Sequence, residues 1–226
     1  MPKPLDFTIQ TKADLIRAVQ TVGILPAFRN SVPGFSVEEN ASPRAWFSEE
    51  EGFWEWKGPV IREAGCAYGK FFEGKAAFVS LHWFLHLANY RRDGYDLDAL
   101  YEEGMVPSRD KTLYDLVVAG EPILSKQLKH DGNYRRGGAT GFDTSMLHLQ
   151  SKGYVVISDF VYLRDRFGPP YGWGVAEYST PERLFGAAFT EEIYRCEPEK
   201  SHALLLSHLT VLLPHADPEK LRRFLG

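Results

Sequence analysis

One stretch of this 226-residue sequence has a net positive charge, and glycines lie among its basic side chains. Residues 121–170 hold 7 basic and 5 acidic side chains, a net charge of +2, whereas the whole chain has a net charge of −4. Glycines just before a helix let backbone N–H groups approach an anion, which the helix dipole also favours. The candidate DNA-contacting residues in this stretch are Lys126, Lys129, Arg135, Arg136, Thr140, Lys152, Arg164 and Arg166. They predict salt-sensitive contact with the phosphates of double-stranded DNA.

A second chemical pattern places carboxylates beside aromatic side chains in residues 34–57. Glu38 and Glu39 are the candidate catalytic residues, because a positioned carboxylate can take a proton from water. Aromatic rings can also stack on an unpaired base. The candidate pocket residues near them are Trp54, Glu55, Trp56, Tyr68, Lys70, Arg91 and Arg92. The alternative is that the acids form a solvated turn and the other charges form ion pairs between two subdomains.

Several kinds of site lack support in the sequence. Cys66 and Cys196 are too few for a disulfide scaffold or a cysteine-rich zinc site. His82 and His86 have the i, i+4 spacing of a metal pair but no glutamate between them, so a core helix is predicted there. Residues 137–141 lack the Lys-Ser/Thr ending of a P-loop. We therefore expect no metal and no cofactor.

The composition is that of a globular protein, with 44% hydrophobic and 25% charged residues. The sequence pI near 6.0 excludes a bulk polycation but not a local basic face. No apolar run reaches the roughly 18 residues of a membrane span, and the first ten residues lack the apolar region of a signal peptide. We expect a soluble, cytoplasmic protein with no membrane partner.

The elements that must position these residues begin with a helix after Thr11, where Asp14 completes a capping box. Residues 24–58 have no regular pattern and are predicted to be irregular. Glu73-Gly74 predicts the two-residue turn of a β-hairpin between residues 67–72 and 75–80. Helices are then expected over residues 81–90 and 96–103.

From residue 107 onward, the pattern predicts three helices followed by two strands. The third helix is expected over residues 140–152, with Thr140 and Asp143 as its capping box. The strands are expected over residues 154–163 and 171–178. This order is typical of a winged helix-turn-helix, in which the third helix enters the major groove and the strands form the wing. The alternative is a winged helix used for dimerisation or as a scaffold.

The sequence thus predicts an α+β chain, mostly helical, with winged helix-turn-helix subdomains and short β-hairpins. Residues 1–106 are expected to form an N-terminal winged-helix-like subdomain that includes the aromatic and acidic segment. Residues 107–178 form the winged helix-turn-helix. Residues 179–226 form C-terminal helices that pack on the core.

Three motifs in this order resemble the AlkZ-related family: Phe53-Trp-Glu-Trp-Lys57, Ala67-Tyr-Gly-Lys-Phe-Phe72 and Asn89-Tyr-Arg-Arg-Asp-Gly-Tyr95. That family is similar to the AlkZ/YcaQ-type winged-helix DNA glycosylases of bacteria, and the resemblance spans residues 22–186. It implies tandem winged-helix subdomains around a DNA channel, excision of alkylated or cross-linked bases, and no metal.

The glycosylases carry a Gln-x-Gln or Gln-x-Asp motif shortly after an N-terminal glycine. The matching stretch here begins at Gly23, and Pro26 and Phe28 occupy the polar positions of the motif. Neither side chain can position a water molecule, so no catalytic residue carries over from the resemblance. An active enzyme would need Glu38 or Glu39 to activate water.

The sequence leaves three functions open. The first is a DNA-binding protein of this family, with a role in DNA repair. The second is a non-enzymatic transcriptional regulator or small-molecule-binding winged-helix protein, whose aromatic patch holds a planar or apolar ligand. The third is an interaction domain that uses the C-terminal helices, residues 198–225, as a partner surface.

Overall fold

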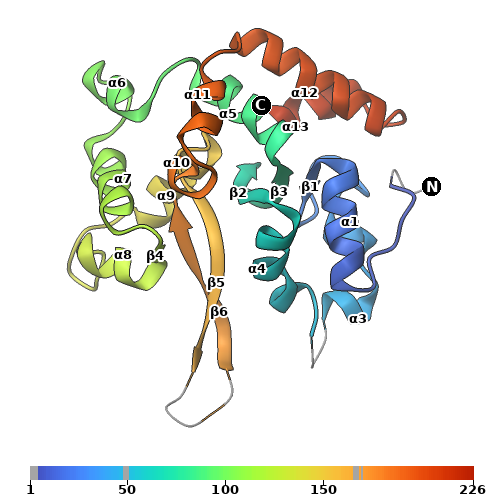
Figure 1. The fold of residues 1–226 in the computed structure, drawn as a ribbon, viewed down its shortest axis with the longest axis horizontal. Coiled ribbons are helices and arrows are strands. Elements are labelled where there is room, and N and C mark those ends of the chain that lie inside the picture. The colour runs from blue at the N-terminus through green and yellow to red at the C-terminus, as the bar shows by residue number, and fades with distance from the viewer. Residues whose placement is uncertain (1–4, 48–50, 165–167, 169) are drawn as a thin grey trace.

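The computed structural model describes residues 5–47, 51–164, 168 and 170–226. Within these residues the chain is α+β and mostly helical, with two antiparallel sheets of three strands each (Figure 1). The predicted fold class is confirmed at this level. No helix among the described residues is long and apolar enough to cross a membrane.

The first unit comprises residues 12–80. Its elements in chain order are α1 (Lys12–Val22), β1 (Ile24–Pro26), α2 (Val37–Asn40), α3 (Pro43–Trp46), α4 (Phe53–Ala64), β2 (Cys66–Phe72) and β3 (Lys75–Ser80). The strands lie in the order β1-β3-β2. The predicted capping box of the first helix is confirmed, because Thr11 Oγ1 accepts from the N–H of Asp14 while the carboxylate accepts from that of Thr11. The predicted hairpin over β2 and β3 is also confirmed.

The second unit comprises residues 108–179. Its elements are α7 (Ser108–Gly120), β4 (Ile123–Leu124), α8 (Ser125–Asp131), α9 (Phe142–Ser151), β5 (Val156–Arg164) and β6 (Pro170–Ser179). The strands lie in the order β4-β6-β5. Figure 1 shows the β5–β6 hairpin extending between α7 and α8 on one side and α1 and α4 on the other.

The remaining helices join the two units. They are α5 (Leu81–Arg92), α6 (Leu97–Glu102), α10 (Pro181–Phe185), α11 (Ala187–Ile193), α12 (Pro198–Leu212) and α13 (Pro218–Leu225). Both α11 and α12 pack on α5 (Figure 1). Asn89 of α5 donates to the carbonyl of Ile193 at 2.5 Å and to that of Cys196 at 2.8 Å, which fixes the chain between these two helices.

In each unit, the last helix before the hairpin packs on the first strand of the other unit's hairpin. In one contact α4 packs on β5, and a Cβ added to Gly58 would lie 2.5 Å from Oδ1 of Asp159. In the other contact α9 packs on β2, where the backbone N–H of Lys70 donates to Gln150 Oε1 at 3.1 Å. Buried residues of both units and of the C-terminal helices form one hydrophobic core.

Two local predictions are wrong. Residues 24–58 are not irregular throughout, since they include β1, two short helices and the start of α4. A proline inside a helix is usually unfavourable, so Pro59 argues against a helix here, but the structure has Pro59 inside α4. The predicted capping box at Thr140 does not form, because α9 begins after Gly141, whose φ of 87° places it in the left-handed region. A glycine there supplies no side-chain acceptor for the first N–H groups of α9.

Candidate functional site

The loop before α9 is folded by its own backbone. Asn133 accepts a hydrogen bond from the N–H of Ala139 at 2.8 Å, and Arg135 accepts one from that of Gly138 at 2.8 Å. The side chains of Arg135 and Arg136 are exposed in this loop, seven and six residues before α9 begins. Neither arginine has a carboxylate within salt-bridge distance among the described residues. Their charges are therefore available to an external anion.

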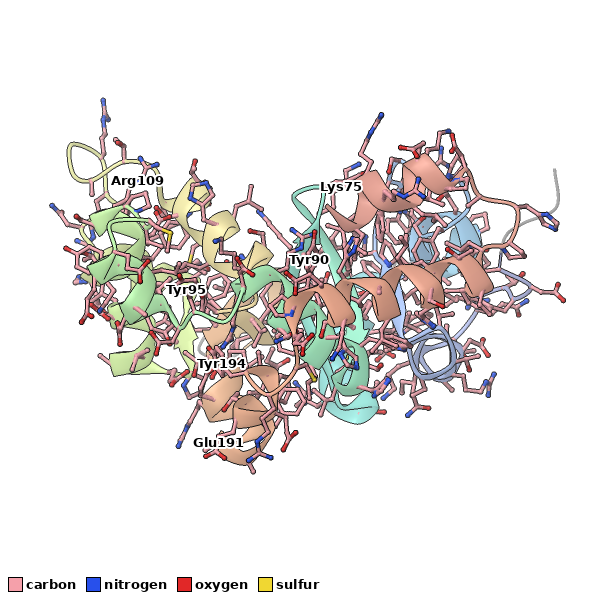
Figure 2. All side chains as sticks on the ribbon, turned by 90° about the horizontal axis from the view of Figure 1, so that it is seen from above. Lys75, Tyr90, Tyr95, Arg109, Glu191 and Tyr194 are labelled. Atoms are coloured by element: carbon pink, nitrogen blue, oxygen red, sulfur yellow. The ribbon has the colours of Figure 1, made fainter. Side chains whose placement is uncertain are left out.

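A third arginine, which the sequence analysis did not single out, lies at the same helix end. The guanidinium of Arg109 in α7 would be 3.4 Å from a Cβ placed on Gly141 (Figure 2). Its neighbour Asp110 is buried, and Oδ2 of that residue is 2.8 Å from Nδ1 of His148 on the exposed face of α9. The contact between α7 and α9 assembles this group, so spacing along the chain gave no sign of it.

The other predicted DNA-contacting residues are spread over the second unit. Lys126 and Thr140 are exposed near the loop, whereas Nζ of Lys129 is 3.7 Å from the carboxylate of Asp143 and 4.5 Å from the ring centre of Phe142. Lys152 follows the far end of α9, about 15 Å along the axis from its start. Arg164 is the last residue of β5, and Arg166 lies outside the described residues.

The two candidate catalytic carboxylates close a loop in the first unit. Glu38 accepts from the backbone N–H of Arg29 at 3.0 Å. Glu39 accepts from the N–H of Gly34 at 2.9 Å and from Ser36 Oγ at 2.6 Å. Both carboxylates therefore already have backbone or hydroxyl donors. Their predicted role in catalysis stays a prediction.

The aromatic part of the predicted pocket packs inside the first unit. Trp46 stacks on Phe53 with ring centres 4.7 Å apart, and Phe28 and Trp54 complete the cluster. The rings of Trp46, Phe53 and Trp54 all contact Phe28, which the sequence analysis matched to a polar position of the AlkZ/YcaQ-type glycosylases. The remaining predicted members are also placed: Trp56 and Tyr68 are buried, Glu55 accepts from the N–H of Gly52 at 3.0 Å, and Lys70 is exposed.

Lys57 is a buried cation that the sequence analysis missed. Its side chain lies between α4 and β5, with Nζ 3.8 Å from the ring centre of Phe160 and 4.9 Å from that of Trp54. Burial lowers the pKa of Lys57 to about 8, and the nearby charge of Glu55 opposes the shift only in part. The FWEWK motif gives no sign that Lys57 is buried, because its burial depends on the packing of α4 on β5.

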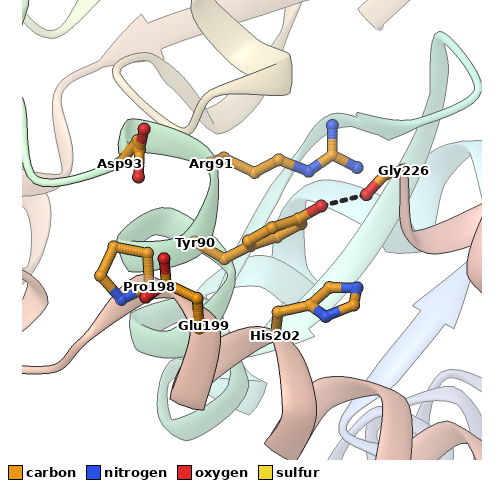
Figure 3. Close-up of a pocket in the computed structure, with 7 residues that line it drawn as sticks. All are labelled: Tyr90, Arg91, Asp93, Pro198, Glu199, His202 and Gly226. Carbon is orange, nitrogen blue, oxygen red and sulfur yellow. Dashed lines mark hydrogen bonds between the residues drawn. The ribbon is translucent and has the colours of Figure 1, made fainter.

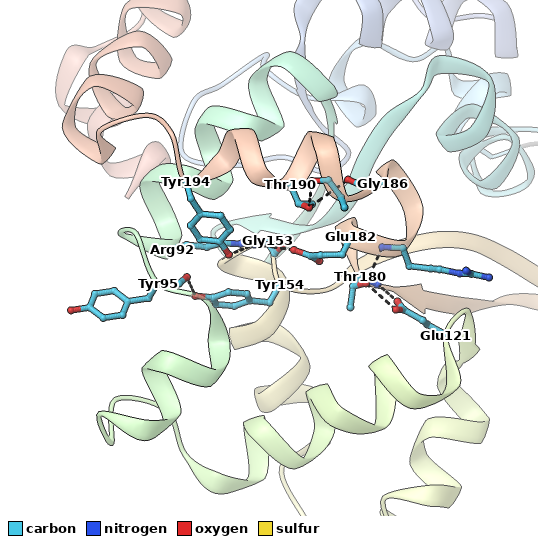
Figure 4. Close-up of polar contacts among 12 residues, drawn as sticks. Arg92, Tyr95, Glu121, Gly153, Tyr154, Thr180, Glu182, Gly186, Thr190 and Tyr194 are labelled. Atoms are coloured by element: carbon cyan, nitrogen blue, oxygen red, sulfur yellow. Dashed lines mark hydrogen bonds and ion pairs between the residues drawn. The ribbon is translucent and has the colours of Figure 1, made fainter.

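Arg92 is the most fully paired charged residue of the predicted pocket, and its side chain is 1% exposed. It donates to Glu182 Oε1 at 3.2 Å, to the Tyr194 hydroxyl at 2.7 Å and to the carbonyl of Gly153 at 2.6 Å (Figure 4). Burial lowers the pKa of this guanidinium, but the charges of Glu182 and Tyr194 outweigh that effect and raise it. Arg92 thereby links α5 to the end of α9 and to α10 and α11.

Arg91, the adjacent residue, lines a cavity that Arg92 does not line. That cavity has a volume of about 450 Å³ and lies between α5 and α12 (Figure 3). Arg91 donates to the carbonyl of Leu225, and the Tyr90 hydroxyl donates to that of Gly226. Arg92 lines a second cavity, of about 270 Å³, together with Tyr114, Tyr154 and Glu182. The predicted pocket residues therefore do not form one pocket, because Trp54 packs in the aromatic cluster and Arg91 and Arg92 line separate cavities. Among the residues that the structure describes, no group of three or more His, Cys, Asp or Glu side chains is arranged to hold a metal ion.

Comparison with known proteins identifies a family. A family model with the description "AlkZ related" matches residues 9–226. The matched range includes both units and the C-terminal helices. No curated protein sequence and no solved structure matches the chain.

Proposed function

Because the chain belongs to the AlkZ-related family, we propose that it binds duplex DNA through its second unit. In this proposal the second unit is a winged helix, in which α7, α8 and α9 are the three helices and β5–β6 is the wing. Its strand order β4-β6-β5 and the antiparallel wing support that assignment. The third helix of such a module enters the major groove, and the wing contacts the backbone or the minor groove.

The observation that carries the proposal is the positive charge around the start of α9. Arg135 and Arg136 are exposed and lack ion-pair partners among the described residues, and Arg109 lies beside Gly141. A helix start without a side-chain cap, beside the guanidinium of Arg109 and after a loop with two exposed arginines, suits a phosphate of the DNA backbone. The exposed face of α9 offers Thr144 and His148 to base edges, which supports backbone contact more than sequence-specific readout.

A role in base excision would depend on residues other than the polar pair of the AlkZ/YcaQ-type glycosylases, which this chain lacks. Pro26 is buried in β1, and Phe28 packs in the aromatic cluster. If Glu38 or Glu39 activated water, the carboxylate would first have to release the loop contacts described above. Our proposal therefore extends to DNA binding, and excision of alkylated bases is the finer hypothesis to be tested with it.

The test is fluorescence anisotropy with a labelled duplex over a series of salt concentrations. We expect affinity to fall steeply with salt, because each bound phosphate releases counterions. The double variant R135A/R136A should bind at least about tenfold more weakly, and its salt slope should be smaller by about two.

The matched control is R222A/R223A, which removes two exposed arginines from α13 and changes the net charge equally. This control should bind within about twofold of the unaltered protein. If both double variants lost the same affinity, binding would reflect overall charge and not this surface. If the unaltered protein did not bind at low salt, the proposed function would be wrong.

A further inference from the structure

His148 lies in the second half of α9, on the face of the helix that is open to solvent. Its side chain is 49% exposed, and Thr144, one helical turn earlier, is exposed on the same face. If α9 enters the major groove as proposed, these two polar side chains lie next to the base edges. Whether His148 can distinguish bases then depends on which hydrogen-bonding group its ring presents to them.

A buried carboxylate of α7 contacts one nitrogen of this imidazole. Oδ2 of Asp110 is 2.8 Å from Nδ1 of His148, and the Asp110 side chain is 3% exposed. Nε of Arg109 is 3.6 Å from Oδ1 of Asp110, which is an ion-pair contact and too long for a hydrogen bond. Among the described residues, His148 is therefore the only hydrogen-bond partner of this carboxylate.

This contact fixes which nitrogen of the ring carries the proton. An ionised carboxylate accepts hydrogen bonds and cannot donate them, so Nδ1 of His148 is the donor. In a neutral imidazole the other nitrogen, Nε2, is then an acceptor. Within the described part of the chain, Nε2 of His148 has no hydrogen-bond partner. The exposed face of α9 therefore presents an acceptor to an external donor.

Two of the four bases offer a donor in the major groove. These donors are the N6 amino group of adenine and the N4 amino group of cytosine. Guanine and thymine present acceptors there, at O6 and N7 of guanine and at O4 of thymine. An acceptor nitrogen of His148 can therefore pair with adenine or cytosine, whereas two acceptors would face each other at guanine or thymine.

We propose that Nε2 of His148 accepts a hydrogen bond from the amino group of an adenine or a cytosine in the major groove, and that Asp110 is the positioning residue for this contact. Asp110 keeps the proton on Nδ1 and holds the orientation of the ring. The inference rests on the proposed DNA binding through α9. It adds one base-dependent contact to the phosphate contacts of the arginines, which do not depend on sequence.

The first measurement needs no DNA. The seven histidines of the full chain are isotope-labelled, and their ring nitrogens are observed by NMR at about pH 8, above the ordinary pKa of imidazole. The signals that disappear in H148A belong to His148. We expect a proton on Nδ1 and none on Nε2. The proposal is overturned if His148 carries its proton on Nε2 or has a proton on both nitrogens.

The second measurement compares two duplexes by fluorescence anisotropy at the same pH. One contains only A·T pairs, and in the other every adenine is replaced by 2-aminopurine, which still pairs with thymine but has its amino group in the minor groove. The second duplex therefore has no amino donor in the major groove. We expect the unaltered protein to bind it about fivefold more weakly, the effect of one neutral hydrogen bond.

Three variants separate the reading residue from its positioning residue. H148A should bind the two duplexes alike. D110N should also bind them alike although it keeps His148, because the new amide can donate to Nδ1 and so place the ring proton on Nε2. The matched control is D115N, which removes an exposed carboxylate from the same helix and should keep the preference.

The outcomes distinguish this inference from the proposed function. If the unaltered protein binds both duplexes equally well, or if D110N keeps the preference, the role of His148 and Asp110 is overturned while DNA binding stands. If the unaltered protein binds neither duplex at low salt, both proposals are wrong.

Discussion

The two units of this protein share an order of elements but use their corresponding helices differently. In both, a first helix and a short strand precede further helices and a hairpin, and the first strand pairs with the last, as β1-β3-β2 and as β4-β6-β5. The late helix of the first unit, α4, is covered by aromatic packing and by β5. That of the second unit, α9, starts at an exposed loop with arginines.

The two hairpins also differ, both in strand length and in how far they are covered by helices. β2 and β3 have 7 and 6 residues, whereas β5 and β6 have 9 and 10. The shorter hairpin packs on α9, and the longer one extends beyond the helices (Figure 1). The same order of helices and strands thus gives a hairpin covered by a helix in the first unit and an outward-facing hairpin in the second.

The largest effect is expected when the junction of the units is broken. R92A should lower the free energy of unfolding by roughly 3–5 kcal/mol, because it leaves the partners of a buried charge unsatisfied. Urea unfolding measures the change. The control is R62A, which removes a half-exposed ion pair between α4 and Asp159. It should cost less than about 1 kcal/mol, and equal losses would mean that burial of Arg92 is not what joins the units.

The next effect tests the buried face of α4. Because the pKa of Lys57 in the folded protein is about 8, against an ordinary 10.5, the unfolded chain binds more protons between these values. The contribution of Lys57 to stability should therefore rise with pH from about 8 to 10.5, by on the order of 3 kcal/mol at most. It is read as the difference between the unaltered protein and K57M, because burial raises the pKa of Cys66 and of Tyr178 and these groups lower stability as the pH rises. K57M should be more stable than the unaltered protein at pH 7 and should lack this rise.

Thermal or urea unfolding at several pH values provides the measurement for Lys57. The exposed Lys70 of β2 supplies the control, because K70M should leave both the stability at pH 7 and its pH dependence unchanged. A rise that persists in K57M would assign the pH dependence to other groups and would contradict a buried, destabilised cation on α4.

A smaller effect concerns the arginine that only the structure revealed at the start of α9. R109A should weaken duplex binding by about fivefold, the loss of one phosphate contact. The counterpart is R17A, which removes an exposed arginine from the first helix of the other unit. Anisotropy should detect a change only for R109A. Equal weakening by both variants would remove the proposed difference between the surfaces of the two units.

The smallest effect is expected at the loop carboxylates of the first unit. E38Q and E39Q keep an acceptor oxygen for the donors that they bind, so each should lower stability by less than about 1.5 kcal/mol. Unfolding and release of alkylated bases are measured together. A variant that lost base release while keeping its stability would restore the catalytic hypothesis for that carboxylate.

Local sequence patterns predicted much of the fold. The capping box of Thr11 with Asp14 and the Glu73-Gly74 turn act through neighbours a few residues away, and both are present in the structure. The predicted start of α9 at Thr140 was wrong, because the left-handed Gly141 ends the loop one residue later. A cap depends on the backbone path of the incoming loop, which residue types alone do not fix.

The candidate site was predicted less completely than the fold. The exposed arginines of the loop could be identified from charge and glycine content, since solvent-exposed residues need no distant partner. The predicted pocket mixed residues that separate in space, and adjacent Arg91 and Arg92 face different cavities. Successive residues of a helix point about 100° apart, so neighbours in sequence can belong to different sites.

The sequence by itself determined the first helix, the β2–β3 hairpin, the basic stretch and the family resemblance, because short-range backbone preferences and hydrophobic spacing act within a few residues. Only the tertiary structure decided which charges are buried. Arg92 lost its water where α5 meets α9, α10 and α11, and Lys57 lost its water where α4 meets β5. Desolvation depends on segments that are distant along the chain, so the roles of these residues follow from packing and not from their own motifs.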